Sequence, residues 1–126
     1  MAAPNVVNVA TISAKTAQIS VNESSDALLL ANAASSGKVF KINTIFVSNT
    51  HDTETAKVDI KFLDKDAITD AGVVSYSLIK NLEIFKGLSV VVLDKGSAMY
   101  MEEDRSIYVK AVQGTADAFI SYEEIS

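Results

Sequence analysis

Apolar and polar residues alternate along several stretches of this chain with the period of two that is typical of β-strands. Residues 57–62 place Val58, Ile60 and Phe62 on one side of an extended segment and polar residues on the other. The same alternation recurs in residues 75–78 and, with both faces partly apolar, in residues 107–112, and residues 118–122 close the chain as another strand. No window carries the i, i+3, i+4, i+7 apolar spacing of a full helix. The pattern therefore predicts an all-β protein.

Three other segments add detail to this prediction. Residues 38–49 form the longest β-rich run, and their apolar phase slips between Phe40/Ile42 and Ile45/Val47, which predicts a bulge or a bend. The continuous apolar run within residues 89–93 predicts a strand that is buried on both faces. Residues 27–34 fit one helical turn or a strand equally well.

Turn-forming residues separate these runs at intervals of about 8–15 residues, the spacing of an antiparallel sandwich or a small barrel. We favour a β-sandwich of jelly-roll or immunoglobulin-like type, with about nine short strands. The earliest strands are expected near residues 6–11 and 18–21. Residues 15–126 are predicted to form this single domain. Residues 1–14 are predicted to be an N-terminal arm that a neighbouring subunit orders.

The composition of the chain excludes several classes of function. The 126 residues suit one domain, and 48% of them are hydrophobic, which is ordinary globular composition. Eleven basic against sixteen acidic residues give a net charge of −5, which argues against nucleic-acid and anionic-membrane partners. There is no cysteine, so disulfides and thiolate chemistry are excluded. The first residues do not resemble a secretory signal, and the longest apolar stretch, residues 27–31, is far shorter than a membrane span, so we expect a soluble protein.

Few residues could carry chemistry. His51 is the sole histidine and lies in a turn-like Asn-Thr-His-Asp context, which favours an exposed loop residue over a metal ligand or a general base. Asp64, Asp66 and Asp70 resemble the opening of a calcium-binding loop. The positions where such a loop requires glycine and glutamate hold Thr69 and Ser75, so we expect an acidic turn on the solvent side with adventitious cation binding as the alternative.

Two further groups have ordinary explanations. Glu102, Glu103 and Asp104 are adjacent, so in extended chain they point to alternate faces, and we expect a solvated turn, as for residues 123–124. Four tyrosines could stack on a sugar but are more typical of a core edge: Tyr76, Tyr100, Tyr108 and Tyr122. We therefore predict no catalytic, cofactor-binding or metal-binding residues, no cofactor and no enzymatic activity.

Four stretches of the chain carry motifs that recur together in one protein family. Residues 38–49 (KVFKINTIFVSN) resemble a recurring KVYKINSIxVSN strand. Residues 88–95 (LSVVVLDK) resemble an SLVVLDK strand and turn, and residues 101–109 and 121–126 are similar to closing LEExDxIxV and SYEEI segments. On these motifs the chain resembles a family of small virion proteins of tailed bacteriophages, especially large contractile-tailed phages of marine cyanobacteria. The likeness covers most of the chain from Lys38 onward, whereas the first 37 residues match less distinctly.

The resemblance implies an all-β accessory protein of a phage particle, most simply a capsid decoration protein. Such a protein would bind the major capsid protein or other virion proteins, form a homo-oligomer (a trimer is our first expectation), and reside in virions assembled in the host cytoplasm. Two alternatives stay open: a tail, neck or baseplate adaptor of the same fold, and a receptor- or carbohydrate-binding β-sandwich.

Overall fold

The computed structural model describes residues 11–126, and these fold as nine strands and one short 3-10 turn. The strands are β1 (Ile12–Val21), β2 (Ala27–Asn32), β3 (Val39–Asn49), β4 (Ala56–Leu63), β5 (Ser75–Ile84), β6 (Ser89–Leu93), β7 (Met99–Met101), β8 (Arg105–Gln113) and β9 (Ala116–Ile125). The 3-10 turn, η1, spans Lys95–Ser97. The prediction of an all-β protein with about nine strands is confirmed. None of the helical residues within 11–126 belongs to a segment with the length and hydropathy of a membrane-spanning helix.

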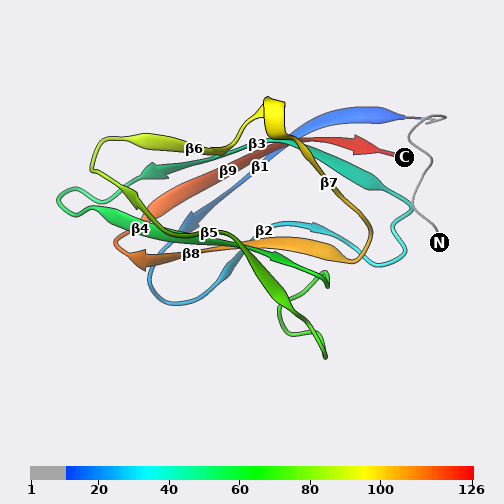
Figure 1. The fold of residues 1–126 in the computed structure, drawn as a ribbon, viewed down its shortest axis with the longest axis horizontal. Coiled ribbons are helices and arrows are strands. Elements are labelled where there is room, and N and C mark those ends of the chain that lie inside the picture. The colour runs from blue at the N-terminus through cyan, green and yellow to red at the C-terminus, as the bar shows by residue number, and fades with distance from the viewer. Residues whose placement is uncertain (1–10) are drawn as a thin grey trace.

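The strands form two antiparallel sheets that lie face to face (Figure 1). One sheet has the order β1-β9-β3-β6, with β7 also paired to β3, and the other has the order β2-β8-β4-β5. We call them sheet A and sheet B. This is the β-sandwich that the turn spacing predicted, and its two layers bury the alternating apolar faces against each other.

The order of the strands decides between the two sandwich types that the sequence left open. Strand pairs are nested along the chain, β1 with β9, β2 with β8, β3 with β6, and β4 with β5. This pattern arises when one long hairpin is rolled up so that successive pairs fall in alternate sheets, which is the jelly-roll arrangement. The connectivity is therefore of the jelly-roll type.

The core lies between the two sheets and is built from the inward positions of every long strand. In β4, Val58 and Ile60 are fully buried and Phe62 packs against them, as their alternation predicted. Other inward side chains with no exposed surface include Ile45, Val47, Ile107, Val109 and Ile120. Because one cluster joins both sheets, the two layers depend on each other for stability.

The predicted irregularity in β3 is a β-bulge. The pairing of β3 with β9 shifts register between Ile42 and Thr44, so one extra residue enters β3 at Asn43. The extra residue brings both Ile42 and Ile45 to the inner face, and each is fully buried. The phase slip in the sequence was thus a direct signal of the bulge.

Three expectations about local structure need correction or completion. Residues 27–32 form strand β2, which settles the choice between a helical turn and a strand. The predicted boundary of the N-terminal arm was wrong at its end: Ile12 to Ala14 pair with β9, so the sandwich begins at Ile12 and not at residue 15. The strand expected near residues 6–11 and the rest of the arm lie outside the described residues, apart from Thr11.

Strand β6 was predicted to be buried on both faces, and this was wrong. It lies at the edge of sheet A, where Val91 is 60% exposed. A continuous β-branched run is typical of a central strand, but an edge strand has a neighbour on one side only. The sequence pattern shows that the residues favour a strand, but it does not show that this strand has a neighbour on one side only.

Two buried asparagines join the sheets at opposite ends of the sandwich. Asn32, at the end of β2, donates from Nδ2 to the carbonyl oxygens of Lys38 (2.9 Å) and Met101 (3.2 Å). Asn49, at the end of β3, donates from Nδ2 to the carbonyl oxygens of Glu54 (2.8 Å) and Ile84 (2.9 Å). Each side chain therefore links its own sheet to a strand of the opposite one.

Candidate functional site

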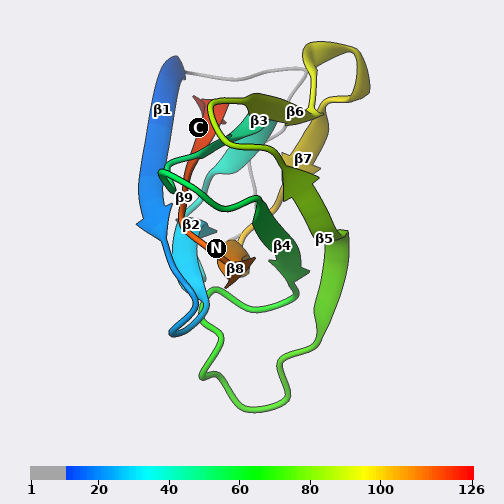
Figure 2. The same ribbon diagram turned by 90° about the vertical axis from the view of Figure 1, so that its left-hand side faces the viewer.

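The densest group of polar contacts surrounds the loop of residues 64–74, which connects β4 to β5 and hangs beside sheet B (Figure 2). Ser106 on β8 donates to the carbonyl oxygen of Lys65 (2.7 Å), and the Ile68 N–H donates to Tyr108 Oη (3.1 Å). These contacts hold the loop over the outer face of β8. They also explain why Tyr108, whose inward neighbours fill the core, is itself buried.

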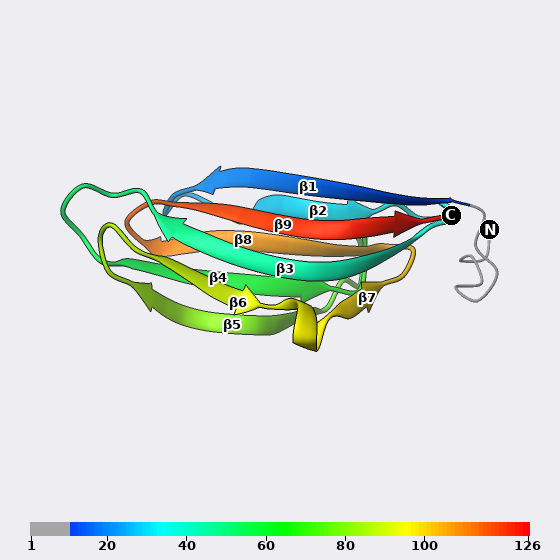
Figure 3. The same cartoon turned by 90° about the horizontal axis from the view of Figure 1, so that it is seen from above.

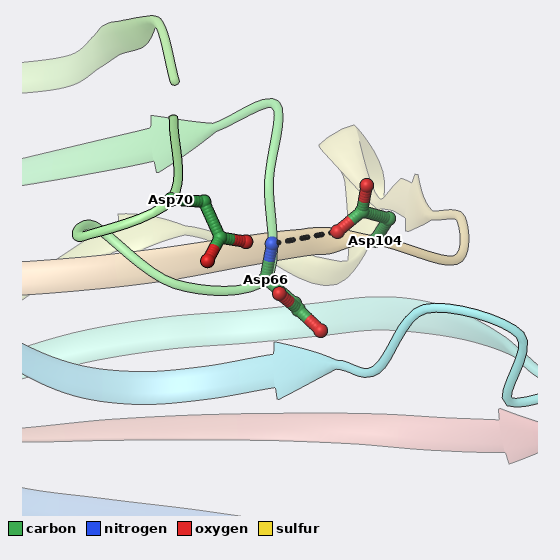
Figure 4. Close-up of side chains that lie close together, drawn as sticks. All are labelled: Asp66, Asp70 and Asp104. Atoms are coloured by element: carbon green, nitrogen blue, oxygen red, sulfur yellow. Dashed lines mark hydrogen bonds between the residues drawn. The ribbon is translucent and has the colours of Figure 1, made fainter. Parts of the chain in front are cut away.

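Three aspartates meet at the root of this loop (Figure 4). Asp66 and Asp70 belong to the loop, whereas Asp104 precedes β8; one carboxylate oxygen of each lies within 4.8 Å of the others. The main-chain N–H of Asp66 donates to Asp104 Oδ1 (3.0 Å), and Lys65 Nζ lies 3.5 Å from Asp104 Oδ2. The sequence predicted the proximity of Asp66 and Asp70 but not the contribution of Asp104.

The surroundings shift the pKa values of Asp66 and Asp70 in opposite directions. The Ala34 N–H, which donates to Asp66 Oδ2 (3.1 Å), lowers the pKa of Asp66 below its ordinary value, and a hydrogen bond with Asp70 lowers it further. That same hydrogen bond raises the pKa of Asp70, and the negative charges of Asp66 and Asp104 act in the same direction. Of Asp66 and Asp70, Asp70 is therefore the one that holds a proton more readily.

The cluster offers three carboxylate oxygens to a cation. Calcium takes six to eight oxygen ligands, so these side chains alone would supply a minority of a calcium coordination sphere. The residues predicted to be an acidic turn are half-buried and are tied to β8 by hydrogen bonds. These hydrogen bonds thus assign the acidic residues a structural role, which is to anchor the 64–74 loop.

The other candidate carboxylates also have structural partners. Glu103 accepts a hydrogen bond from the Gly37 N–H (3.0 Å), and residues 102–104 form the predicted turn before β8. Glu124 forms ion pairs with Lys15 (3.2 Å) and Lys38 (3.4 Å). Glu123 lies 3.8 Å from Lys41 Nζ. These groups stabilise strand ends and do not converge on a common pocket.

The tyrosines divide into two pairs. Tyr108 and Tyr122 are buried, and Tyr122 packs against Phe40 with ring centroids 5.0 Å apart. Burial raises the pKa of Tyr122, and the charge of Lys15 opposes that shift. Tyr76 and Tyr100 are more than half exposed and lie on β5 and β7. The four rings therefore form no common stacking platform.

His51 lies in the loop between β3 and β4, at the opposite end of the sandwich from the aspartate cluster. Its Nδ1 accepts hydrogen bonds from the N–H groups of Thr53 (3.2 Å) and Glu54 (3.0 Å). A shallow depression of about 440 Å³ adjoins it, lined by residues 49–52 together with Lys86 and Gly87. The expected turn-like setting is confirmed, but the ring is partly buried and forms hydrogen bonds within the loop.

Exposed apolar side chains gather along one edge of the sandwich, a feature that the sequence pattern did not predict. Within residues 11–126, six of the ten exposed large hydrophobic side chains lie on β5, β6, β7 or the turn between β5 and β6. We call these six the β5–β7 edge: Tyr76, Leu78, Phe85, Leu88, Val91 and Tyr100. Figures 2 and 3 show that these strands lie side by side, away from β1 and β2. Alternation failed as a signal here because edge strands expose apolar residues that a central strand would bury.

Comparison with known proteins adds no family to this description, since no protein-family model and no curated protein sequence matches the chain.

Proposed function

We propose that this protein is a non-enzymatic structural component of a bacteriophage particle, and specifically a decoration protein that binds the outer surface of the capsid. The observation that carries the proposal is the β5–β7 edge, six exposed apolar and aromatic side chains on the edge strands of both sheets and the turn between them. Aromatic side chains are enriched in the buried parts of protein interfaces. The partner is the major capsid protein.

The stretches that resemble virion proteins support the same proposal. They contribute β3, β6 and part of β9 in sheet A and part of β8 in sheet B. One of them, residues 88–95, includes Leu88 and Val91 of the β5–β7 edge. The resemblance and the exposed surface thus meet at this stretch.

The jelly-roll topology is compatible with this role, since the same architecture occurs in viral capsid proteins and also in lectins. A fold alone does not determine function, so the topology supports the proposal only together with the exposed edge. Attachment would require a contact of about 1,000 Å² or more for each copy. A protein that binds only the assembled shell stabilises it by mass action.

Quantitative mass spectrometry of purified particles tests the location. A decoration protein is expected at on the order of hundreds of copies per particle, whereas a tail, neck or baseplate adaptor is expected at about six or twelve. Absence from purified particles would overturn both. Particles with and without the protein are then heated, and a decoration protein should raise the temperature at which the shell ruptures.

The attachment surface is tested with two double variants. Phe85→Ser with Val91→Ser removes apolar surface from the β5–β7 edge and should reduce retention on capsids at least tenfold. Ile12→Ser with Val112→Ser removes exposed apolar side chains elsewhere and should leave retention unchanged. Equal retention of the two double variants would show that this edge is not the attachment surface. A glycan array probes the receptor-binding alternative with the same folded protein.

A further inference from the structure

The loop between β3 and β4 is held by two side chains that act on its main chain. Asn49 Oδ1 accepts a hydrogen bond from the His51 N–H (2.7 Å), while its Nδ2 donates to the Glu54 and Ile84 carbonyl oxygens. His51 Nδ1 then accepts from the N–H groups of Thr53 and Glu54. The imidazole therefore provides acceptor capacity for the two N–H groups at the turn of this loop.

These contacts define the protonation state of the ring. A nitrogen that accepts two N–H donors cannot carry a hydrogen of its own, so Nδ1 is unprotonated and the neutral ring holds its proton on Nε2. Addition of a second proton would place a hydrogen on Nδ1, directly opposite two donors. Both main-chain hydrogen bonds would then be lost.

The surroundings of the ring supply partners for the charged form. Glu54 Oε2 lies 3.8 Å from Nε2, and Asp52 and Lys86 line the adjoining depression. From the β8–β9 turn, Gly114 lies beside His51, and its N–H donates to Glu23 Oε2 (3.0 Å). Of these charged groups, Glu54 is the one whose carboxylate faces a ring nitrogen.

We propose that His51 is a protonation-controlled latch of the β3–β4 loop: the neutral imidazole closes the loop through the N–H groups of Thr53 and Glu54, and the imidazolium releases them while its Nε2–H stays beside the Glu54 carboxylate. A proton on Nδ1 removes the acceptor of both N–H groups, so acid opens the latch. The loop borders the exposed turn of Phe85 and Leu88, so its release alters that end of the sandwich. This inference does not depend on the proposed capsid role.

Nuclear magnetic resonance of the isotope-labelled full chain tests the latch. At pH 8, the Nδ1 signal of His51 should be that of an unprotonated acceptor nitrogen. At the same pH, hydrogen exchange at the Thr53 and Glu54 amides should be about three- to tenfold slower than in a His51→Ala variant, the equivalent of an ordinary hydrogen bond. At an acidic pH where the ring signals show the imidazolium, the wild type and His51→Ala should exchange at equal rates.

The comparison at each pH cancels the intrinsic effect of pH on exchange. The Ser97 amide, which donates to Asp94 Oδ1 (3.2 Å), serves as an internal control and should not differ between the two proteins at either pH. A difference at Thr53 and Glu54 that persists unchanged once the ring signals show the imidazolium would overturn the proposal. So would an Nδ1-protonated ring at pH 8.

Discussion

At the scale of single residues, the polar side chains inside this protein matter most where they satisfy main-chain groups at the ends of strands. Asn32 is fully buried, and its Nδ2 donates to the carbonyl oxygens of Lys38 and Met101, while its Oδ1 accepts from Ser36 Oγ. A buried carbonyl without a donor carries a desolvation cost. Asn32 and Asn49 avoid that cost where the chain passes from one sheet to the other.

Replacement of Asn32 by alanine should destabilise the protein by about 2–4 kcal/mol, because two main-chain carbonyls lose their donor in a buried setting. The free energy of unfolding, measured in urea, reports this change. Asn22→Ala is the matched control, since Asn22 is exposed, and it should change stability by less than about 1 kcal/mol. Similar losses in the two variants would contradict the assigned role of Asn32.

The aspartate cluster leads to a prediction about pH. The pKa of Asp70 is raised from its ordinary value of 3.8, so its contribution to stability is present below that value and is lost as pH rises through its folded pKa. The lowered pKa of Asp66 has the opposite sign: its contribution is present above 3.8 and is lost as pH falls through its folded pKa. At neutral pH the charge of Asp70 is therefore the unfavourable one.

Asp70→Asn should accordingly raise the melting temperature at pH 7, because the amide removes a negative charge and can still donate to Asp66. The gain should shrink towards pH 3, where wild-type Asp70 is protonated. Melting curves at both pH values check this, with Asp52→Asn as a control for the same change in net charge. A gain that is equal at both pH values, or a lower melting temperature at pH 7, would contradict the assignment.

At the scale of elements, the edge strands and their irregularities shape the surface. Strand β5 changes register against β4 near Ile60, and Asn81 adopts a left-handed conformation (φ 52°) with its N–H bound to Asp59 Oδ1 (2.7 Å). Such irregularities discourage uncontrolled pairing of an edge strand with another chain. The β5–β7 edge can therefore present apolar side chains without offering a regular strand for aggregation.

The outer face of sheet A contains a stacked aromatic pair across neighbouring strands. Phe46 on β3 lies directly opposite Phe119 on β9, with ring centroids 4.7 Å apart and planes inclined by 10°. A double-mutant cycle with Phe46→Leu and Phe119→Leu should give a coupling energy of about 0.5–1.5 kcal/mol. A parallel cycle with Phe46→Leu and the distant Tyr76→Leu should give none, and equal couplings would contradict a specific contact.

At the scale of the whole molecule, the nested pairing joins the two ends of the chain. Strand β1 pairs with β9 along its entire length, from Ile12 opposite Ile125 to Val21 opposite Ala116. Sheet A is complete only when these distant segments pair, and topologies rich in such non-local contacts fold in about milliseconds to seconds. Both sheets also share one core.

A shared core predicts cooperative unfolding. Far-ultraviolet circular dichroism, which follows the strands, and near-ultraviolet signals of the buried Tyr108 and Tyr122 should show the same midpoint in urea. Separate midpoints would mean that one sheet persists without the other. As an internal check, an Ile45→Ala variant should move both midpoints together, since Ile45 is fully buried between the sheets.

Much of the fold could be predicted because its signals are local. Alternation in β4 and β9, and the phase slip in β3, depend only on which face of an extended chain each residue occupies. The edge position of β6 could not be predicted this way, because exposure depends on the number of neighbouring strands. The candidate site was incomplete for the same reason: Asp104 is 34 residues beyond Asp70, and only the packing of the 64–74 loop on β8 brings them together.

The sequence by itself determined the all-β class, the approximate number of strands, the bulge and most inward positions. These features depend on the alternation of side chains between the two faces of a strand, which is a property of residues adjacent in sequence. Only the tertiary structure decided the jelly-roll order, the start of the sandwich at Ile12, the buried asparagine links and the exposed β5–β7 edge. These features arise from pairing and packing between segments far apart in the chain, and such pairings depend on the free energy of the whole assembled core rather than on any local pattern.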